Sequence, residues 1–266
     1  MIAITTDGSE RSTHVFPHAA KLAAALGWPL GLLHVLGPDD EPGQVEDDLR
    51  NMMDVAGIEA ARAVIERTKE EDVASAILRA ANELGARILA MDSRGHGALH
   101  HVLSGSVAMS VIGRSTIPLL LTGPKAEVPV QSEAFRVLVT ADRSPASEGI
   151  LSALQPLLSS LQVTLLMVFV PELADRGDRV ELASCHQYLQ DVQNRLLSGL
   201  RCDVVVKRAG APRDVAPIIV NTAMEVRASA IAMSTRGHAA RQHVIFGSTA
   251  ADVLGQSPLP LLLARQ

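Results

Sequence analysis

The chain repeats itself, and this repetition constrains its fold more than any other feature. Ser93-Arg94-Gly95-His96 returns as Thr235-Arg236-Gly237-His238. Gly95 and Gly237 lie 142 positions apart, and the same distance separates the two Pro-Leu-Leu-Leu runs that begin at Pro118 and Pro260. A period of about half the chain predicts two copies of one domain. We place them at residues 1–123 and 134–266, joined by a polar linker that contains two prolines.

Each half alternates short apolar runs with segments of helical periodicity. The runs predict strands at 1–6, 29–36, 63–68, 88–91 and 118–121, and again at 135–140, 163–170, 202–207, 230–233 and 259–263. Helices are expected between them, the first over 10–26. This alternation requires right-handed crossovers and predicts an open α/β fold in each half, a parallel sheet with helices on both faces. In such sheets ligands bind at the carboxyl ends of the strands, where the winding reverses.

The composition excludes several classes of partner. Aromatic residues make up 2% of the chain and the formal net charge is −5, so neither base stacking nor a basic phosphate-binding surface supports nucleic-acid binding. No apolar run approaches the roughly 20 residues of a membrane span. Cys185 and Cys202 show no disulfide or metal spacing, and no basic leader opens the chain. We therefore expect a cytoplasmic protein without nucleic-acid or membrane partners.

An Asp-x-Ser-x-x-Ser pattern follows the first strand of each half, beginning at Asp7 and at Asp142. One interpretation is purely structural, because Ser9 and Ser144 are suited to cap the following helix. The other is that each Asp faces a ligand at the carboxyl end of its strand.

A glycine-bounded loop follows the fourth strand of each half. Gly95 precedes nine residues and Gly105-Ser106, and Gly237 precedes nine residues and Gly247-Ser248, with Thr249 next. Free N–H groups at a helix N-terminus favour an anion, and phosphate fits this arrangement. A turn followed by a helix cap is the alternative, but two copies, each paired with an Asp, favour binding.

With these motifs the chain resembles a tandem universal stress protein over essentially its full length. The nucleotide-binding signature of that family is Gly, two residues, Gly, nine residues, Gly, then Ser or Thr. The loops here match its last three elements, whereas Asp92 and Ser234 stand where the first Gly belongs.

The resemblance implies a Rossmann-like five-stranded parallel sheet of order 3-2-1-4-5 in each half, and ATP as the ligand. It implies that Asp7 and Asp142 recognise adenine and that Val35 and Val168 pack beside it. The residues it assigns to ribose and phosphates are Asp92, Gly95, Gly105 and Ser106 in the first half, and Ser234, Gly237, Gly247, Ser248 and Thr249 in the second.

The departure at the first Gly bears on affinity. A carboxylate at Asp92 could accept a hydrogen bond from a ribose hydroxyl or could repel a nearby phosphate. Ser234 is small and neutral, so the sequence slightly favours the second half as the nucleotide site.

Loop histidines invite a metal interpretation, but His96, His100, His101, His238 and His243 lack a carboxylate or Cys at a recognisable ligand spacing. We expect no metal site, and we expect the histidines to flank the anion. Arg94 or Arg236 could help to neutralise phosphate, or could be solvated.

Three functions follow from these features. The first is an ATP-binding stress-response protein whose nucleotide occupancy acts as a switch. The second is an interaction protein without nucleotide. The resemblance implies that its terminal strands at 117–121 and 259–263 pair the halves into an internal pseudo-dimer, with a homodimer of whole chains and an unidentified protein partner left open. The third is an enzyme, for which the sequence supplies no clear general base or Walker lysine; slow ATP hydrolysis with Mg²⁺ is the most it allows.

Overall fold

The computed structural model describes residues 1–38, 40–65, 71–94, 106–129, 134–170, 178–234 and 246–264, without the side chains of residues 62, 63, 178 and 179. The elements of the first half are β1 (Ile2–Thr6), the 3-10 helix η1 (Glu10–Val15), α1 (Phe16–Leu26), β2 (Leu30–Val35), α2 (Pro42–Ala56), β3 (Ala60–Ile65), α3 (Val73–Glu83), β4 (Ile88–Asp92), α4 (Ser106–Arg114) and β5 (Leu119–Thr122). Those of the second half are β6 (Arg136–Thr140), α5 (Pro145–Leu158), β7 (Gln162–Phe169), α6 (Asp178–Leu196), β8 (Cys202–Arg208), the 3-10 helix η2 (Pro212–Asp214), α7 (Val215–Glu225), β9 (Ala230–Ser234), α8 (Ser248–Gln256) and β10 (Leu261–Ala264).

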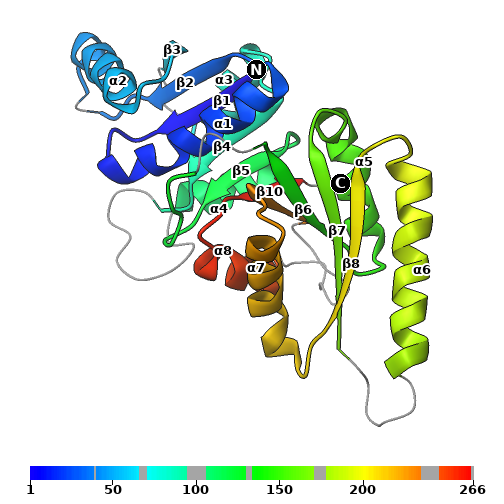
Figure 1. The fold of residues 1–266 in the computed structure, drawn as a ribbon. Helices are drawn as coiled ribbons and strands as arrows, with labels where there is room; N and C mark the ends of the chain where they lie inside the picture. The colour runs from blue at the N-terminus through cyan, green and yellow to red at the C-terminus, as the bar shows by residue number, and fades with distance from the viewer. Residues whose placement is uncertain are drawn as a thin grey trace.

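The strands form one ten-stranded sheet in the order β3-β2-β1-β4-β5-β10-β9-β6-β7-β8. Within each half the pairing is parallel and the order is 3-2-1-4-5, as the resemblance implies. The two expected sheets are therefore joined into one, with β5 and β10 at its centre (Figure 1).

The seam between the halves is antiparallel and entirely leucine. Leu261 pairs with Leu121, Leu262 with Leu120, and Leu263 with Leu119. All six side chains are buried, and a fully buried leucine contributes about 2 kcal/mol relative to an exposed one. The terminal strands thus pair the two halves into the internal pseudo-dimer that the sequence suggested.

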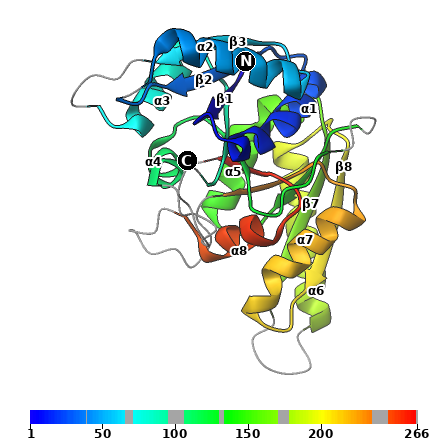
Figure 2. The same cartoon turned by 90° about the vertical axis from the view of Figure 1, so that its left-hand side faces the viewer.

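Apolar residues alternate between the two faces of the sheet because side chains point to opposite sides along a strand. Ile2 and Ile4 pack beneath α1, and Ala3 packs on the face that α3 and α4 cover. The buried residues of the second half continue both clusters, so one core layer lies on each face of the sheet. Figure 2 shows the helices of both halves on either side of it.

Most strand boundaries lie within two residues of the sequence prediction, and two elements differ by more. The third strand begins at Ala60 rather than at 63, because Ala60 pairs with Leu30 at the start of β2, and residues 66–68 of the prediction lie outside the described residues. The predicted helix over 10–26 begins with a 3-10 segment, and the α-helix starts only at Phe16, beside Pro17. Among the described helices, none is long and apolar enough to cross a membrane.

Candidate functional site

A crevice of about 430 Å³ opens in the first half at the carboxyl ends of β1, β2 and β4. This is where the winding of the sheet reverses, since β2 and β4 flank β1 on opposite sides. Four of the residues that the resemblance assigns to a nucleotide line it, namely Asp7, Val35, Asp92 and Ser106. Gly95 and Gly105 lie outside the described residues, as do the loop histidines and Arg236.

The turn after β1 holds Asp7 in a fixed place. One carboxylate oxygen, Oδ1, accepts hydrogen bonds from the Ser9 backbone N–H at 3.0 Å and from the Ser9 hydroxyl at 2.6 Å. Gly8 between them adopts φ +80°, a left-handed conformation that glycine takes without steric cost. The Ser9 Oγ also accepts from the Ser12 N–H at 3.3 Å and caps η1.

The second half builds the same turn at Asp142. Its Oδ1 accepts from the Ser144 N–H at 3.0 Å and from the Ser144 hydroxyl, and Ser144 Oγ caps α5 by accepting from Ser147 N at 3.1 Å. Both motifs therefore cap a helix, as the structural interpretation expected. In the first half the capping also places Asp7 in the wall of the crevice, so the two interpretations are compatible.

Asp92 is buried at the end of β4, and its two carboxylate oxygens have partners in the protein. Oδ1 accepts from the Arg94 backbone N–H at 2.9 Å, with Arg94 Nε at 3.4 Å, and Oδ2 accepts from the Thr122 hydroxyl at 2.8 Å. Burial raises the pKa of Asp92, and the hydrogen bonds from Arg94 and Thr122 oppose that rise. The carboxylate thus anchors the start of the loop, a role that the sequence did not indicate.

Among the described residues that line the crevice, Arg94 is the only arginine, and there is no lysine. Its side chain is 17% exposed and its Nη2 is buried without a hydrogen-bond partner in the described part of the chain. A buried guanidinium nitrogen without an acceptor is costly, and an anionic oxygen would satisfy it.

The remaining walls offer an apolar slot and a helix N-terminus. Leu33, Val35, Ile77 and Met91 provide apolar surface from β2, α3 and β4. Ser106 is the first residue of α4, where backbone N–H groups lack intrahelical partners and the helix dipole favours an anion. The crevice therefore combines an apolar part with the N-terminus of α4 and the guanidinium of Arg94.

His34 also lines the crevice, and the sequence analysis missed it. Its Nε2 lies 3.3 Å from Asp40 Oδ2, and its Nδ1 is buried with no partner in the part of the chain that the structure describes. A hydrogen bond from the Gly37 N–H, followed by the contact with His34, lowers the pKa of Asp40. The signal was a single histidine within the otherwise apolar run Leu30–Val35.

The corresponding residues of the second half occupy the same places in the topology. Asp142 follows β6, Val168 lies on β7, Ser234 ends β9, Gly247 is the N-cap of α8, and Ser248 and Thr249 begin that helix. Gly237 lies outside the described residues. The strand registers place Met167 where the first half has His34, so the two halves differ at this wall.

Comparisons with known proteins agree with this fold. The model of the universal stress protein family matches residues 1–123 and 134–265. A universal stress protein from Archaeoglobus fulgidus is 22% identical with a TM-score of 0.69, covering 99% of this chain and 97% of that one. One described as a putative universal stress protein from Pseudomonas aeruginosa is 15% identical with a TM-score of 0.65, covering 99% and 92%. No curated protein sequence matches the chain.

Proposed function

Since the chain belongs to the universal stress protein family, we propose that it binds an adenine nucleotide, with ATP as the preferred ligand. In this proposal the protein acts in the stress response as a nucleotide-dependent switch. The observation that carries the proposal is the crevice at β1 and β4. It brings Asp7, Val35 and Ser106 together with Arg94, whose Nη2 is buried.

The chemistry of the walls supports one orientation of the ligand. The adenine ring lies against Val35 and the neighbouring apolar side chains, with Asp7 accepting a hydrogen bond from its exocyclic amine. The phosphates lie at the N-terminus of α4, where Ser106 donates a hydrogen bond and Arg94 supplies positive charge. Because Asp92 accepts from Arg94 and Thr122, its carboxylate orients the cation, and the positive charge of Arg94 offsets the repulsion between Asp92 and the phosphates.

We assign the nucleotide to the first half, although the sequence slightly favoured the second. The argument from sequence depended on the repulsion of phosphate by Asp92, and the contacts of this carboxylate with Arg94 weaken that argument. Adenine nucleotide binding at the second half remains part of the test below.

Occupancy of this site would stabilise the folded state, by about 2.7 kcal/mol at a hundredfold excess of ATP over Kd. That free energy is enough to bias a conformational equilibrium that a partner protein reads. We place the protein in the cytoplasm, in keeping with the two cysteines, both of which are free thiols.

A second candidate function is assembly without nucleotide. The buried leucine seam between β5 and β10 favours it, since this contact needs no ligand to form. In that case the crevice would bind no nucleotide. The paired halves would act as a scaffold for other proteins, either as a single chain or as a homodimer of whole chains.

The experiment compares two matched variants, Ser106→Glu and Ser248→Glu. Each adds a carboxylate to the first turn of a helix, where it suits the dipole and leaves the fold intact. Mg-ATP binding is measured by calorimetry on protein purified without nucleotide, after denaturing a sample to count any adenine nucleotide carried through purification. We expect Ser106→Glu to weaken ATP binding about tenfold or more and Ser248→Glu to leave it within about threefold.

The opposite ranking of the two variants would move the site to the second half. No nucleotide in the purified protein, together with no heat of binding at millimolar Mg-ATP, would reject the proposal and leave assembly as the function.

A further inference from the structure

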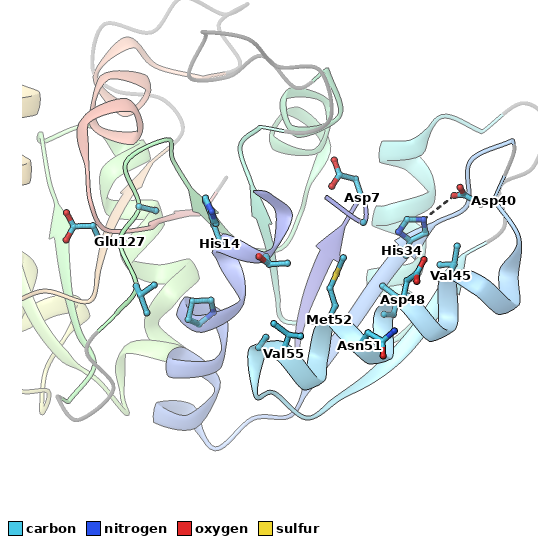
Figure 3. Close-up of a pocket in the computed structure, with 17 residues that line it drawn as sticks. Asp7, His14, His34, Asp40, Val45, Asp48, Asn51, Met52, Val55 and Glu127 are labelled. Atoms are coloured by element: carbon cyan, nitrogen blue, oxygen red, sulfur yellow. Dashed lines mark hydrogen bonds and ion pairs between the residues drawn. The ribbon is translucent and has the colours of Figure 1, made fainter. Parts of the chain in front are cut away.

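A second, larger cavity of about 910 Å³ lies in the first half, and Asp7 is the one described residue of its lining that the nucleotide proposal uses. Its walls are η1 with the start of α1 on one side and α2 on the other, and linker residues 126–128 close one end (Figure 3). We call it the α2 groove. It shares Asp7, His34 and Asp40 with the crevice but extends away from the carboxyl end of β4.

The floor of the α2 groove is apolar, and its mouth carries exposed valines. Leu49 and Met52 of α2 lie along it with Pro17 opposite. Val55 on α2 is 91% exposed and Val128 on the linker is 80% exposed, and both line the cavity. Large apolar side chains that are exposed to solvent around an apolar cavity indicate a surface that another molecule covers.

The rim of the α2 groove is acidic. Asp7, Asp40, Asp48 and Glu127 line it, and no lysine or arginine does among the lining residues that the structure describes. Asp48 is exposed and Glu127 lies across the groove from it (Figure 3). Such a rim attracts a cationic partner and disfavours an anionic one.

The second half shows that the fold does not require an open groove at this place. There the helices α5 and α6 are bridged by Tyr188, whose hydroxyl donates to Glu148 at 3.0 Å, and by Arg195, whose Nη2 lies 3.2 Å from the same carboxylate. The guanidinium of Arg143 lies 5.8 Å from the centre of the Tyr188 ring. In the first half the space between η1 and α2 is a cavity instead.

His34 lines both the α2 groove and the crevice. Its side chain is 10% exposed, and its Nδ1 has no partner among the described residues. A buried ring nitrogen without a partner is destabilising unless something supplies one.

We propose that the α2 groove docks an amphipathic basic peptide segment of a partner protein, with apolar side chains on the floor and Lys or Arg at the acidic rim. A groove between two helices with an apolar floor accepts an amphipathic helix through residues at i, i+3 and i+7. Methionine at Met52 suits such a surface because its unbranched side chain adapts to different apolar partners. The valines at the mouth come from two separate segments, which favours a peptide over a small molecule enclosed within the cavity.

The test uses the full chain and a synthetic amphipathic helix of leucine and lysine labelled with a fluorophore. We expect saturable binding by anisotropy, weakened about tenfold by Val55→Asp and similarly by Asp48→Lys. A peptide with Glu in place of Lys should not bind. Val180→Asp on α6 and Asp54→Lys on α2 are matched controls, because both residues are exposed and neither lines the groove.

Equal losses in Val55→Asp and Val180→Asp, or binding of the Glu peptide as tight as that of the Lys peptide, would overturn the proposal. A change of oligomeric state in Val55→Asp by analytical ultracentrifugation, with peptide binding unaltered, would also overturn it and identify a second copy of the chain as the occupant. Neither result depends on ATP, so a failure here is distinct from a failure of the nucleotide site.

Discussion

At the end of β4, one buried carboxylate fixes the position of one cation. Asp92 holds both the backbone and the side chain of Arg94, while Thr122 occupies its other oxygen. A charged pair that is held before the ligand arrives loses little conformational entropy on binding. Arg94 should therefore act on the phosphates and leave the recognition of adenine to Asp7 and Val35.

Replacing Arg94 by Gln separates the binding of phosphate by Arg94 from the recognition of adenine by Asp7 and Val35. A hydrogen bond to a charged group contributes about 1.5–3 kcal/mol, so ATP affinity should fall about 10- to 100-fold. Adenosine, which lacks phosphate, should bind within about threefold of the wild type. Calorimetric titration of both ligands measures this, and an equal loss for ATP and adenosine would contradict a phosphate role and indicate damage to the crevice.

The sequence identified this site only in part. The resemblance implied that Asp7, Asp92 and Ser106 lie at one crevice, and all three line it, because strand ends at a winding reversal meet in any fold of this order. Gly95 and Gly105 lie outside the described residues. The direction of the Asp92 side chain could not be predicted. It depends on Thr122, which lies 30 residues away and meets Asp92 only through the pairing of β4 with β5.

At the scale of elements, the strands were more predictable than their ends. Apolar runs and the repeat placed every strand, but β3 begins three residues before its predicted start. Its sequence, Ala-Ala-Arg-Ala-Val-Ile, has no strong alternation, and its register is set by pairing with β2. The α2 groove could not be predicted either, because it depends on how far α2 stands from α1.

The seam also brings a glycine against a helix of the other half. Gly123 follows β5, and a Cβ placed on it would meet the Leu254 carbonyl of α8. The clash cannot be relieved by the movement of a flexible side chain, because the atoms nearest to this Cβ belong to the backbone of Leu254.

Gly123→Ala should therefore destabilise the protein by about 1–3 kcal/mol through overpacking at this contact. Gly43→Ala is the matched control, because a Cβ at Gly43 in α2 meets nothing within 4 Å. The control should be neutral or slightly stabilising, as alanine favours a helix. Urea unfolding followed by circular dichroism compares the midpoints, and equal midpoints for the two variants would show that the halves are not packed closely at Gly123.

At the scale of the whole molecule, the linker ties the two halves together through Glu127. Its backbone N–H donates to the Pro258 carbonyl of the second half at 2.9 Å, and its backbone carbonyl accepts from His18 on α1. The pKa of His18 is lowered to about 4, chiefly by burial; Lys21 and His14 contribute to this lowering, and the hydrogen bond to the Glu127 carbonyl opposes it.

This lowered pKa predicts acid lability. The unfolded chain binds a proton at His18 near pH 6.5 and the folded chain only near 4, so the unfolded state carries more protons between these values. Stability contributed by neutral His18 is thus present above pH 6.5 and is lost as the pH falls toward 4, by on the order of 3 kcal/mol.

His18→Gln keeps a hydrogen-bond donor for the Glu127 carbonyl and removes the titration. The free energy of unfolding of this variant, measured in urea at intervals across this pH range, should fall less steeply than that of the wild type. His186→Gln on α6 is the control, and a slope in His18→Gln as steep as in the control would refute the assignment.

Because the leucine seam lies within one chain, the pairing of the two halves does not depend on protein concentration. Two separate protomers joined through their last strands would come apart on dilution, and each would then present an unpaired apolar edge to the solvent. Here a covalent linker holds β5 and β10 in one chain, so their effective concentration is independent of how many molecules a cell contains. Tethering also frees the two halves from identical sequence, which is how one of them can keep a groove that the other has closed.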